Sequence, residues 1–442
     1  MGAANSHPGY ESRADLLGKE GAIGWYAGCS LRRAMKARWL AVLLLGCAAN
    51  EADVPAPLSS GPPAPPQTPI ESEEPTPGAT PPAPEPAPNP APSLMIGFNG
   101  RIEQIAKVAT FWQAEGPARG GPKLCHFYPT WDVALRPAGD GDPALVGSRA
   151  YLEKWLATAG PVCDEVLVSF KSHPVSLGGR GNDTGVTAPP TVAQMRAAFE
   201  AFVATKWTGY PGTFSFAPWN EPNNADGAGT GLGQALTAER AAEYYLALRA
   251  VCGAPAAKKC LVVGGDFASN GTLVDDFQSK CADDDVPENQ LCAGATYLDR
   301  YKSFIANHAD EYALGKGFRP EYFAFHPWFD VNDYLRNGAH CNDLARCSTK
   351  ALLGNLTGTW ANVELWDTEI GVGQNDLEPD DDLQACGAAY LVRLSKLSPR
   401  ITRIYYTHLT SGPGRLLTGT AARPALGLLA TRAASAPGRT CR

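Results

Sequence analysis

The chain has 442 residues, of which 44% are hydrophobic and 19% charged, and its net charge is −7. These are ordinary values for a globular protein, and the acidic balance excludes a broad basic surface for nucleic acid. No strict glycine triplet repeat and no apolar run approaching about 18 residues occur, which excludes a collagen-like chain and a multi-span membrane protein. Sixteen of the 38 prolines lie between Pro55 and Pro92, so the length does not divide evenly into domains.

Residues 35–47 contain the features of an export signal in the expected order. Lys36 and Arg38 precede the apolar run Trp39–Leu45, which is too short to span a bilayer. The segment Leu44-Leu45-Gly46-Cys47 resembles the lipobox of bacterial lipoproteins. This resemblance implies that Cys47 is lipidated and that the protein is anchored in the bacterial cell envelope, at the outer membrane or surface. A secreted protein and a short buried helix are the alternatives.

Two segments flank this signal. Residues 1–34 show no periodicity, and we expect them to be either disordered or an extension that results from a start codon assigned too far upstream. Residues 48–93 are rich in proline and alanine and cannot bury enough apolar surface to fold, so they are expected to be a disordered linker. The linker is interpreted as a tether; a ligand for a proline-binding module is the alternative. Residues 94–442 then form one domain.

Ten cysteines follow the linker, and this even number fits a disulfide-bearing exported domain. Cys252/Cys260, Cys281/Cys292 and Cys341/Cys347 are plausible local pairs, although the sequence does not give the connectivity. None has the spacing of a zinc site, and the acidic runs lack EF-hand spacing. We therefore expect no metal and no cofactor.

Short apolar runs alternate with amphipathic segments after residue 94. Eight strands interleaved with helices predict parallel βα units, as in a (β/α)₈ TIM barrel; a doubly wound open sheet shows similar alternation. The expected strands are Met95–Asn99, Leu124–Thr130, Glu165–Phe170, Thr213–Trp219, Cys260–Gly265, Tyr322–Trp328, Val363–Glu369 and Arg403–His408. The clearest helices are expected at Ala150–Ala159, Thr191–Trp207, Thr237–Val251, Thr296–His308, Leu344–Leu356 and Leu383–Leu397.

Glutamates follow two of these strands. Glu221 ends the fourth strand, in Trp219-Asn220-Glu221-Pro222-Asn223, and Glu369 ends the seventh, in Trp366-Asp367-Thr368-Glu369. The carboxyl ends of barrel strands meet at the active-site mouth, so both side chains can face one bound group. Two facing carboxylates are what glycosidic cleavage requires. The alternative is one surface turn and one paired core acid.

These two segments resemble the motifs of the clan A glycoside hydrolases, which are barrel enzymes with glutamates on strands four and seven. The resemblance implies that Glu221 is the acid/base, that Glu369 is the nucleophile of a retaining double displacement, and that Asn220 hydrogen-bonds the sugar. His326, which ends the sixth strand, resembles the residue that clan members place beside the nucleophile.

Aromatic residues near strand ends can stack on sugar faces. Trp131, Trp328 and Tyr406 are the candidates for such contacts, and ordinary packing is the alternative. Many clan members carry a tryptophan on strand eight and an arginine near strand two. Here Ile404-Tyr405-Tyr406 and Tyr128-Pro129-Thr130 occupy those places, which leaves the subfamily and the glycan open.

The sequence therefore predicts a retaining O-glycosidase that acts on an oligo- or polysaccharide as a monomer. Two alternatives remain: a non-catalytic carbohydrate-binding lipoprotein on the same scaffold, and a metal-dependent barrel hydrolase. The first predicts binding without product, and the second predicts inactivation by a chelator.

Overall fold

The computed structural model of this chain describes most of the predicted domain. The described residues are 94–116, 121–172, 174–175, 185–186, 189–223, 236–253, 260–269, 297–338, 341, 347–373, 380–407, 409–410, 414–438 and 441. The expected signal segment, Cys47, the linker and the Cys281/Cys292 pair lie outside these residues.

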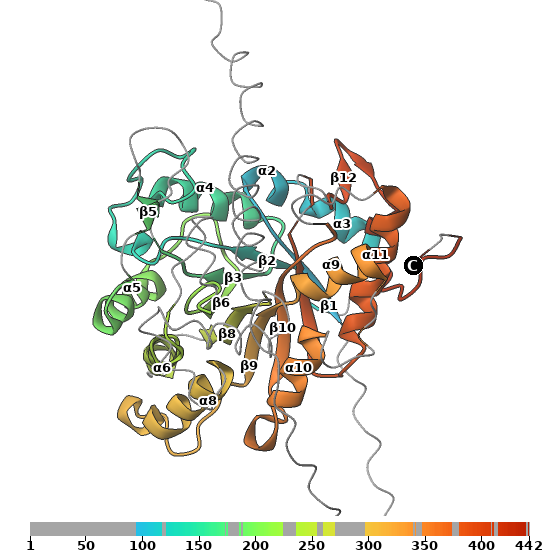
Figure 1. Ribbon diagram of the computed structural model, residues 1–442. Coiled ribbons are helices and arrows are strands. Elements are labelled where there is room, and N and C mark those ends of the chain that lie inside the picture. Colours follow the sequence, from blue (N-terminus) through green and yellow to red (C-terminus); the bar gives the residue numbers. More distant parts are fainter. Residues whose placement is uncertain are drawn as a thin grey trace, which may run out of the picture. The chain divides into compact units, whose positions relative to one another are not determined.

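The central feature is a sheet of nine parallel strands (Figure 1). Their order in the sheet is β7-β6-β3-β2-β1-β11-β10-β9-β8. The strands are β1 (Met95–Asn99), β2 (Leu124–Phe127), β3 (Glu165–Ser169), β6 (Thr213–Ala217), β7 (Leu261–Val262), β8 (Gly264–Ala268), β9 (Tyr322–His326), β10 (Glu364–Ile370) and β11 (Ile401–Tyr406). Short antiparallel pairs are formed by β4 (Pro174–Val175) with β5 (Gly185–Val186) and by β12 (Leu417–Thr418) with β13 (Ala421–Ala422).

The two edge strands of this sheet are consecutive in the chain. Only Val263 separates β7, which pairs with β6, from β8, which pairs with β9. The two short strands therefore act as the halves of one broken fifth strand and bring the sheet edges together. The predicted TIM-barrel class is confirmed, because all eight expected strand positions are occupied in barrel order.

Helices surround the sheet (Figure 1). All six predicted helices are present; α10 begins four residues later than expected. α2, α3, α9 and α12 were not among the predicted helices. The α-helices are α2 (Ile102–Ile105), α3 (Val108–Glu115), α4 (Arg149–Ala159), α5 (Val192–Ala204), α6 (Ala238–Gly253), α8 (Tyr297–His308), α9 (Trp328–Asn337), α10 (Ser348–Asn355), α11 (Asp381–Ser395) and α12 (Pro424–Ala430). No described helix has the length and apolarity needed to cross a membrane.

Local signals explain several helix starts. Thr191 and Gln194 form a reciprocal capping box at α5, and the Thr237 side chain accepts a hydrogen bond from Arg240 N at the start of α6. Both caps satisfy backbone N–H groups that the first helical turn leaves without a partner.

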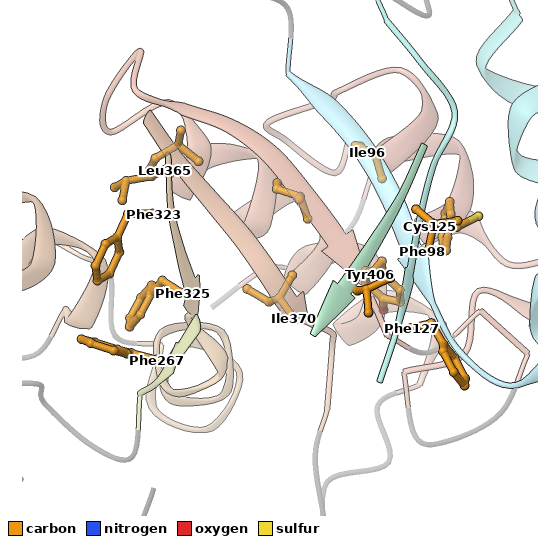
Figure 2. Close-up of a cluster of buried hydrophobic side chains, with 14 of the residues drawn as sticks. Ile96, Phe98, Cys125, Phe127, Phe267, Phe323, Phe325, Leu365, Ile370 and Tyr406 are labelled. Carbon is orange, nitrogen blue, oxygen red and sulfur yellow. The ribbon is translucent and has the colours of Figure 1, made fainter. Parts of the chain in front are cut away.

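Alternation along the strands divides the core into two layers. One set of side chains fills the barrel interior: Leu124, Leu167, Ala217, Val263, Ala324, Trp366 and Tyr405. The intervening residues face the helices and form the larger core (Figure 2), which includes Phe98, Phe127, Phe325, Leu365 and Tyr406. Neighbouring residues Tyr405 and Tyr406 thus belong to different layers, as the period of two in a strand requires.

An ion pair lies near the amino-terminal end of the barrel strands. Arg403 Nη1 is 2.6 Å from Glu165 Oε1, and the two side chains are only 11% and 14% exposed. The guanidinium also lies over the Trp366 ring, 3.8 Å from its centroid, in a cation–π contact. Removing either partner of this pair is expected to destabilise the fold, because the remaining charge would have little water around it.

Four disulfides are present among the described cysteines. The predicted pairs Cys252–Cys260 and Cys341–Cys347 are confirmed. Cys125–Cys163 and Cys386–Cys441 join residues 38 and 55 positions apart. These two depend on the tertiary fold, which is why sequence spacing could not indicate them.

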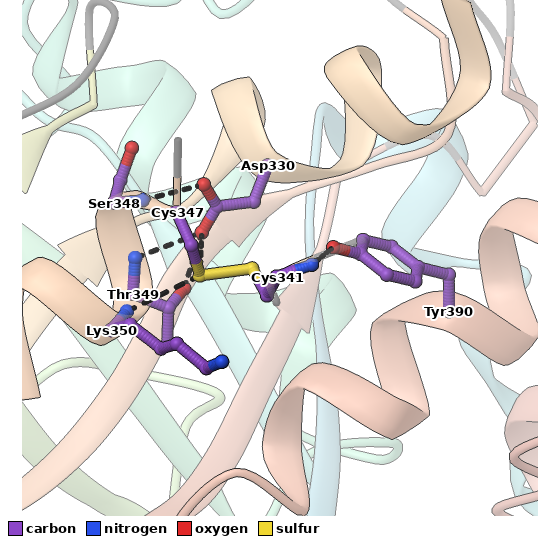
Figure 3. The surroundings of a disulfide bond; sticks show 7 residues. All are labelled: Asp330, Cys341, Cys347, Ser348, Thr349, Lys350 and Tyr390. Carbon is purple, nitrogen blue, oxygen red and sulfur yellow. Dashed lines mark hydrogen bonds between the residues drawn. A yellow bond between two sulfur atoms is a disulfide. The ribbon is translucent and has the colours of Figure 1, made fainter. Parts of the chain in front are cut away.

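The Cys341–Cys347 disulfide lies beside a buried carboxylate (Figure 3). Asp330 accepts hydrogen bonds from the backbone N–H groups of Ser348 and Thr349 and from the Thr349 hydroxyl. It therefore caps the start of α10 from a neighbouring helix. Although Asp330 and the two sulfurs are close enough for a metal site, both sulfurs are consumed by the disulfide and offer no thiolate.

Candidate active site

The loop after β6 places Glu221 at the barrel mouth. Asn220 N–H donates to Phe170 O at 2.7 Å, and Glu221 N–H donates to Asp266 O at 2.9 Å. Glu221 has a φ of 48°, in the left-handed region that is unfavourable for a residue with a Cβ. Such strain persists only where the surroundings fix it, and it concentrates at functional sites.

Asn223 fixes the same loop to the next strand. Its Nδ2 donates to Ala268 O at 2.9 Å, and its Oδ1 accepts from Ala268 N at 2.8 Å. These are the two bonds that a paired strand would supply. The second asparagine of the Asn-Glu-Pro-Asn sequence therefore replaces a strand partner for β8 and holds the loop that carries Glu221.

A bulge in β8 brings Asp266 into the barrel. Gly265 and Asp266 have φ values of 80° and 70°, and the register with β9 shifts between Gly265 and Phe267. A Cβ on Gly265 would lie 2.7 Å from Ala324 O, so glycine is required there for close approach as well as for its φ. Bulges of this kind redirect a side chain, here the carboxylate of Asp266.

His326, the last residue of β9, lies between two carboxylates. Its Nε2 is 3.0 Å from Asp266 Oδ1, and its Nδ1 is 3.0 Å from Glu221 Oε1. Burial alone would lower the pKa of His326, but the charge of Asp266, hydrogen bonds to Asp266 and Glu221, and the charge of Glu369 together raise it well above 6.5. Each ring nitrogen lies within hydrogen-bond distance of a carboxylate oxygen, an arrangement that favours the doubly protonated imidazolium.

Glu369 approaches the same nitrogen of His326 as Glu221 does. Its Oε2 is 3.9 Å from His326 Nδ1 and accepts a 2.8 Å hydrogen bond from the Tyr128 hydroxyl. Tyr128 in turn accepts from Asn99 Nδ2, which also donates to Thr407 Oγ1. Strands β1, β2, β10 and the end of β11 thus contribute to the position of one carboxylate.

The positions of the two glutamates relative to His326 limit their separation. Because His326 Nδ1 lies 3.0 Å from Glu221 Oε1 and 3.9 Å from Glu369 Oε2, these two oxygens are at most about 6.9 Å apart. The side chains remain 13% and 19% exposed, so both can be reached from solvent.

The carboxylate of Glu369 resists ionisation. Burial raises its pKa, the charge of His326 lowers it, and the charge of Glu221 raises it; the net direction is upward. The Tyr128 hydrogen bond favours the ionised form and limits this rise. Lys171 follows β3 nearby; burial lowers its pKa, while the charge of Glu369 acts in the opposite direction.

A second group of polar residues lies beneath the glutamates. His126 Nδ1 donates to Thr368 O at 2.9 Å, so its Nε2 accepts from the Ser169 hydroxyl at 2.7 Å. Burial lowers the pKa of His126 to about 4, although the charge of Asp266 opposes this, and the ring is therefore neutral. The Thr368 hydroxyl donates to Asp266 Oδ1 at 2.6 Å, which links this group to the one above.

Of the residues predicted for the site, Glu221, Glu369 and His326 lie together, and Asn220 directly precedes Glu221. The Asn220 side chain is buried, and its Oδ1 receives no hydrogen bond from any group in the described part of the chain. Oδ1 of Asn220 is thus a buried acceptor one residue before Glu221.

The three predicted stacking residues occupy different environments. Trp131 is partly buried and hydrogen-bonds through its backbone to Lys171, while Trp328 begins α9 directly after the β9 strand and is 7% exposed. Tyr406 is fully buried in the outer core, where its hydroxyl accepts from Val372 N and donates to Gly414 O. This placement differs from the expectation of a sugar-stacking residue, because strand alternation points Tyr406 toward the helices.

Sequence reasoning missed Asp266 and the role of Tyr128. Asp266 stands at the carboxyl end of the fifth strand, so the rule that selected Glu221 and Glu369 also applied to it. Tyr128 directly follows β2 and appeared only as a departure from the arginine of clan members. Its hydrogen bond to Glu369 gives the position a function of its own.

Comparison with known proteins gives likenesses of fold at low identity. No family model matches the chain, and no curated protein matches it. Similar solved structures include a glucosidase from Croceicoccus marinus, at 13% identity and a TM-score of 0.43, with 75% of this chain and 63% of that chain covered.

Two further similar structures are a GH30 endoxylanase from Clostridium papyrosolvens C71 and a GH128 endo-beta-1,3-glucanase from Amycolatopsis mediterranei. The first has 16% identity, a TM-score of 0.40, and coverage of 77% of this chain and 72% of that chain. The second has 15% identity, a TM-score of 0.36, and coverage of 78% and 100%. The barrel is established by this chain's own strand pairing, and scores this low add no argument about its chemistry.

Proposed function

We propose that the protein is a retaining glycoside hydrolase in which Glu221 is the acid/base and Glu369 the nucleophile. Glu369 attacks the anomeric carbon while Glu221 gives a proton to the leaving oxygen, and a covalent glycosyl-enzyme forms. In the second half, Glu221 takes a proton from water, and the water oxygen displaces Glu369. No metal or cofactor is needed for either step.

The observation that carries this proposal is the placement of both carboxylates around one imidazolium. The limit of about 6.9 Å between one oxygen of each carboxylate is compatible with the carboxyl separation of about 5–5.5 Å that is typical of retaining enzymes. Burial raises the pKa of Glu369, and the charge of His326 and the Tyr128 hydrogen bond act against that rise, toward the ionised form that a nucleophile requires.

The surroundings of the pair also suit a sugar. Oδ1 of Asn220 is a buried acceptor without a donor among the described residues, and a sugar hydroxyl would satisfy it. Trp131 and Trp328 follow β2 and β9 at the same end of the barrel and are proposed to contact the sugar rings.

Glutamine substitution tests the assignment. Glu221→Gln and Glu369→Gln would be assayed on a polysaccharide panel that includes β-1,3-glucan and xylan, with the exposed Glu200→Gln as the matched control. We expect each active-site variant to lose at least about 10³-fold in kcat, because Glu369→Gln removes the nucleophile and Glu221→Gln removes the proton transfer. Proton NMR of the first product should show retained anomeric configuration.

Four results would contradict the proposal in different ways. Wild-type activity in both glutamine variants would exclude Glu221 and Glu369 as the catalytic pair. A product of inverted anomeric configuration would exclude Glu369 as the nucleophile. Saccharide binding without any product favours the carbohydrate-binding alternative. Loss of activity with a chelator favours the metal-dependent alternative.

We also propose that the domain is exported and tethered through lipidated Cys47, with residues 48–93 as the spacer. Four disulfides support an oxidising compartment. Partition of the wild-type protein into a detergent phase, and of Cys47→Ala into the aqueous phase, is the expected result. Equal partition of both, or mature peptides from residues 1–34 by mass spectrometry, would contradict it.

A further inference from the structure

Asp266 makes direct contacts that lead to both candidate glutamates. Its backbone oxygen accepts from Glu221 N at 2.9 Å, and its Oδ1 contacts His326 Nε2, whose other nitrogen contacts Glu221 Oε1. The same Oδ1 accepts from the hydroxyl of Thr368, the residue before Glu369. One residue is therefore connected to the backbone and carboxylate of Glu221 and to the strand that carries Glu369.

These contacts cross the weakest part of the barrel. The β6–β7 ladder contains two register pairs, Ser215 with Leu261 and Phe216 with Val262, whereas the β3–β6 ladder contains five. Above the short ladder, the hydrogen bond from Glu221 to Asp266 continues the connection between the fourth and fifth strands. Both partners have positive φ, so two strained residues stabilise each other across this seam.

We propose that Asp266 is a positioning residue: it keeps His326 doubly protonated against Glu221, and the His326 Nδ1 proton is the one that Glu221 passes to the leaving oxygen. This inference rests on the proposed hydrolase function and adds a residue that the glutamate pair alone does not require. His326 Nδ1 lies 3.0 Å from Glu221 Oε1, so the ring can supply the proton that Glu221 delivers.

The proton balance closes over the two half-reactions. In the first, one proton moves from His326 Nδ1 to Glu221 and then to the leaving oxygen, which keeps the electrons of the broken C–O bond. Glu369 forms the bond to the anomeric carbon, and His326 becomes neutral while its Nε2–H still donates to Asp266. In the second, water gives one proton through Glu221 back to His326, and its oxygen displaces Glu369.

Several charged or titratable groups face His326 and contribute to its protonation. Asp266, Glu221 and Glu369 favour the imidazolium, and neutral His126 lies below. Asp367 lies on the adjacent strand, and burial raises its pKa well above the usual value, which disfavours the charged form that Asp266 provides. Asp266 is fully buried, and although burial acts to raise its pKa, the charge of His326 and the hydrogen bonds from His326 and Thr368 keep it low.

The direct test is the ionisation of His326 in the full chain. With ¹⁵N-labelled histidine, the wild-type spectrum at pH 7 should show one of the seven histidines with both ring nitrogens protonated, absent from His326→Gln. In Asp266→Asn this ring should become neutral at lower pH, because an adjacent negative charge is lost. Asparagine tolerates the left-handed φ and keeps the shape of the side chain.

Activity provides the second readout. Asp266→Asn should lower kcat/KM by about 10²-fold, the lower end of a general acid–base contribution, and should move the alkaline limb of the pH profile to lower pH. Asp367→Asn, a buried aspartate on the next strand, is the matched control and should leave that limb in place. A purely structural role for Asp266 would lower activity and melting temperature without moving the limb.

Two outcomes overturn the inference. One is the finding that His326 of the wild-type protein is neutral at pH 7. This measurement does not depend on whether Asp266→Asn folds. The other is a His326 titration or alkaline limb in Asp266→Asn that coincides with the wild type. The NMR experiment requires no substrate. If His326 is doubly protonated but the protein hydrolyses no glycan, the proposed function fails while the ionisation of His326 is as inferred.

Discussion

Tyr128 and Glu369 are joined by a 2.8 Å hydrogen bond although their strands, β2 and β10, are separated in the sheet by β1 and β11. The contact therefore crosses the barrel mouth. It provides the carboxylate with a neutral donor whose own pKa is raised well above 10 by burial and by the charge of Glu369. Tyr128 therefore stays protonated, and remains a donor to Glu369, to a higher pH than an ordinary tyrosine.

Removing that hydroxyl should change the acid side of the pH profile. In the proposed mechanism Glu369 is active as a nucleophile above its pKa, and activity is lost as the pH falls through that value. Since the Tyr128 hydrogen bond lowers the pKa of Glu369, Tyr128→Phe should move the acid limb of kcat/KM to higher pH. Tyr210→Phe, which removes a hydroxyl bonded to Thr213 O, is the control and should leave the limb unchanged. Coincident profiles for all three proteins would contradict the role of Tyr128.

Asn220 should be tested with matched substrates. Asn220→Ala removes the buried acceptor that we assign to the sugar 2-hydroxyl and should cost about 1–3 kcal/mol of transition-state binding, measured from kcat/KM. On a 2-deoxy substrate the same substitution should cost little, because the partner hydroxyl is already absent. Equal losses on both substrates would show that Asn220 acts only by positioning Glu221.

The ion pair near the opposite end of the barrel should affect stability alone. Arg403→Leu leaves Glu165 with little solvent and no cation, so the free energy of unfolding should fall by about 3–5 kcal/mol in a denaturant titration. The double variant Glu165→Leu/Arg403→Leu should recover much of this loss. kcat/KM of the folded protein should not change, because the carboxyl ends of the strands carry the chemistry. Equal destabilisation of the single and double variants would argue against the pair.

The disulfides should differ in their contribution to stability. Cys386–Cys441 joins residues 55 apart, whereas Cys341–Cys347 joins residues 6 apart. Loop-closure entropy predicts a loss of about 4 kcal/mol when both cysteines of the long loop are replaced by alanine and about 2 kcal/mol for the short one. Thermal unfolding of the two double variants measures this order, and a larger loss for the short loop would show that packing around Asp330 dominates.

Much of the barrel was predictable because its strands carry a strong local signal. The bounds expected for the first strand agree with β1, and Glu221 and Glu369 were found by a rule about strand ends. Irregular geometry was not predictable from periodicity. The bulge at Gly265 and Asp266 turns an acidic side chain inward, and neither residue type alone indicates this.

Register explains the difference at Tyr406. Tyr405 and Tyr406 are adjacent aromatic residues, and a shift of one position exchanges the barrel interior for the outer core. The expectation of stacking selected a residue that the pleat directs toward the helices. Long-range contacts such as Cys386–Cys441 and Tyr128–Glu369 depend on the assembled barrel and leave no local trace in the sequence.

The short pairing between β6 and β7 has a consequence for how the enzyme would fail on heating. Local opening begins where the fewest backbone hydrogen bonds must break, and this seam lies directly below Glu221. Amide exchange should therefore be fastest around Leu261 and Val262 among the eight strands. If Glu221 is the acid/base as proposed, inactivation should precede cooperative unfolding, because separation of the fourth and fifth strands displaces Glu221 while the rest of the barrel is still folded.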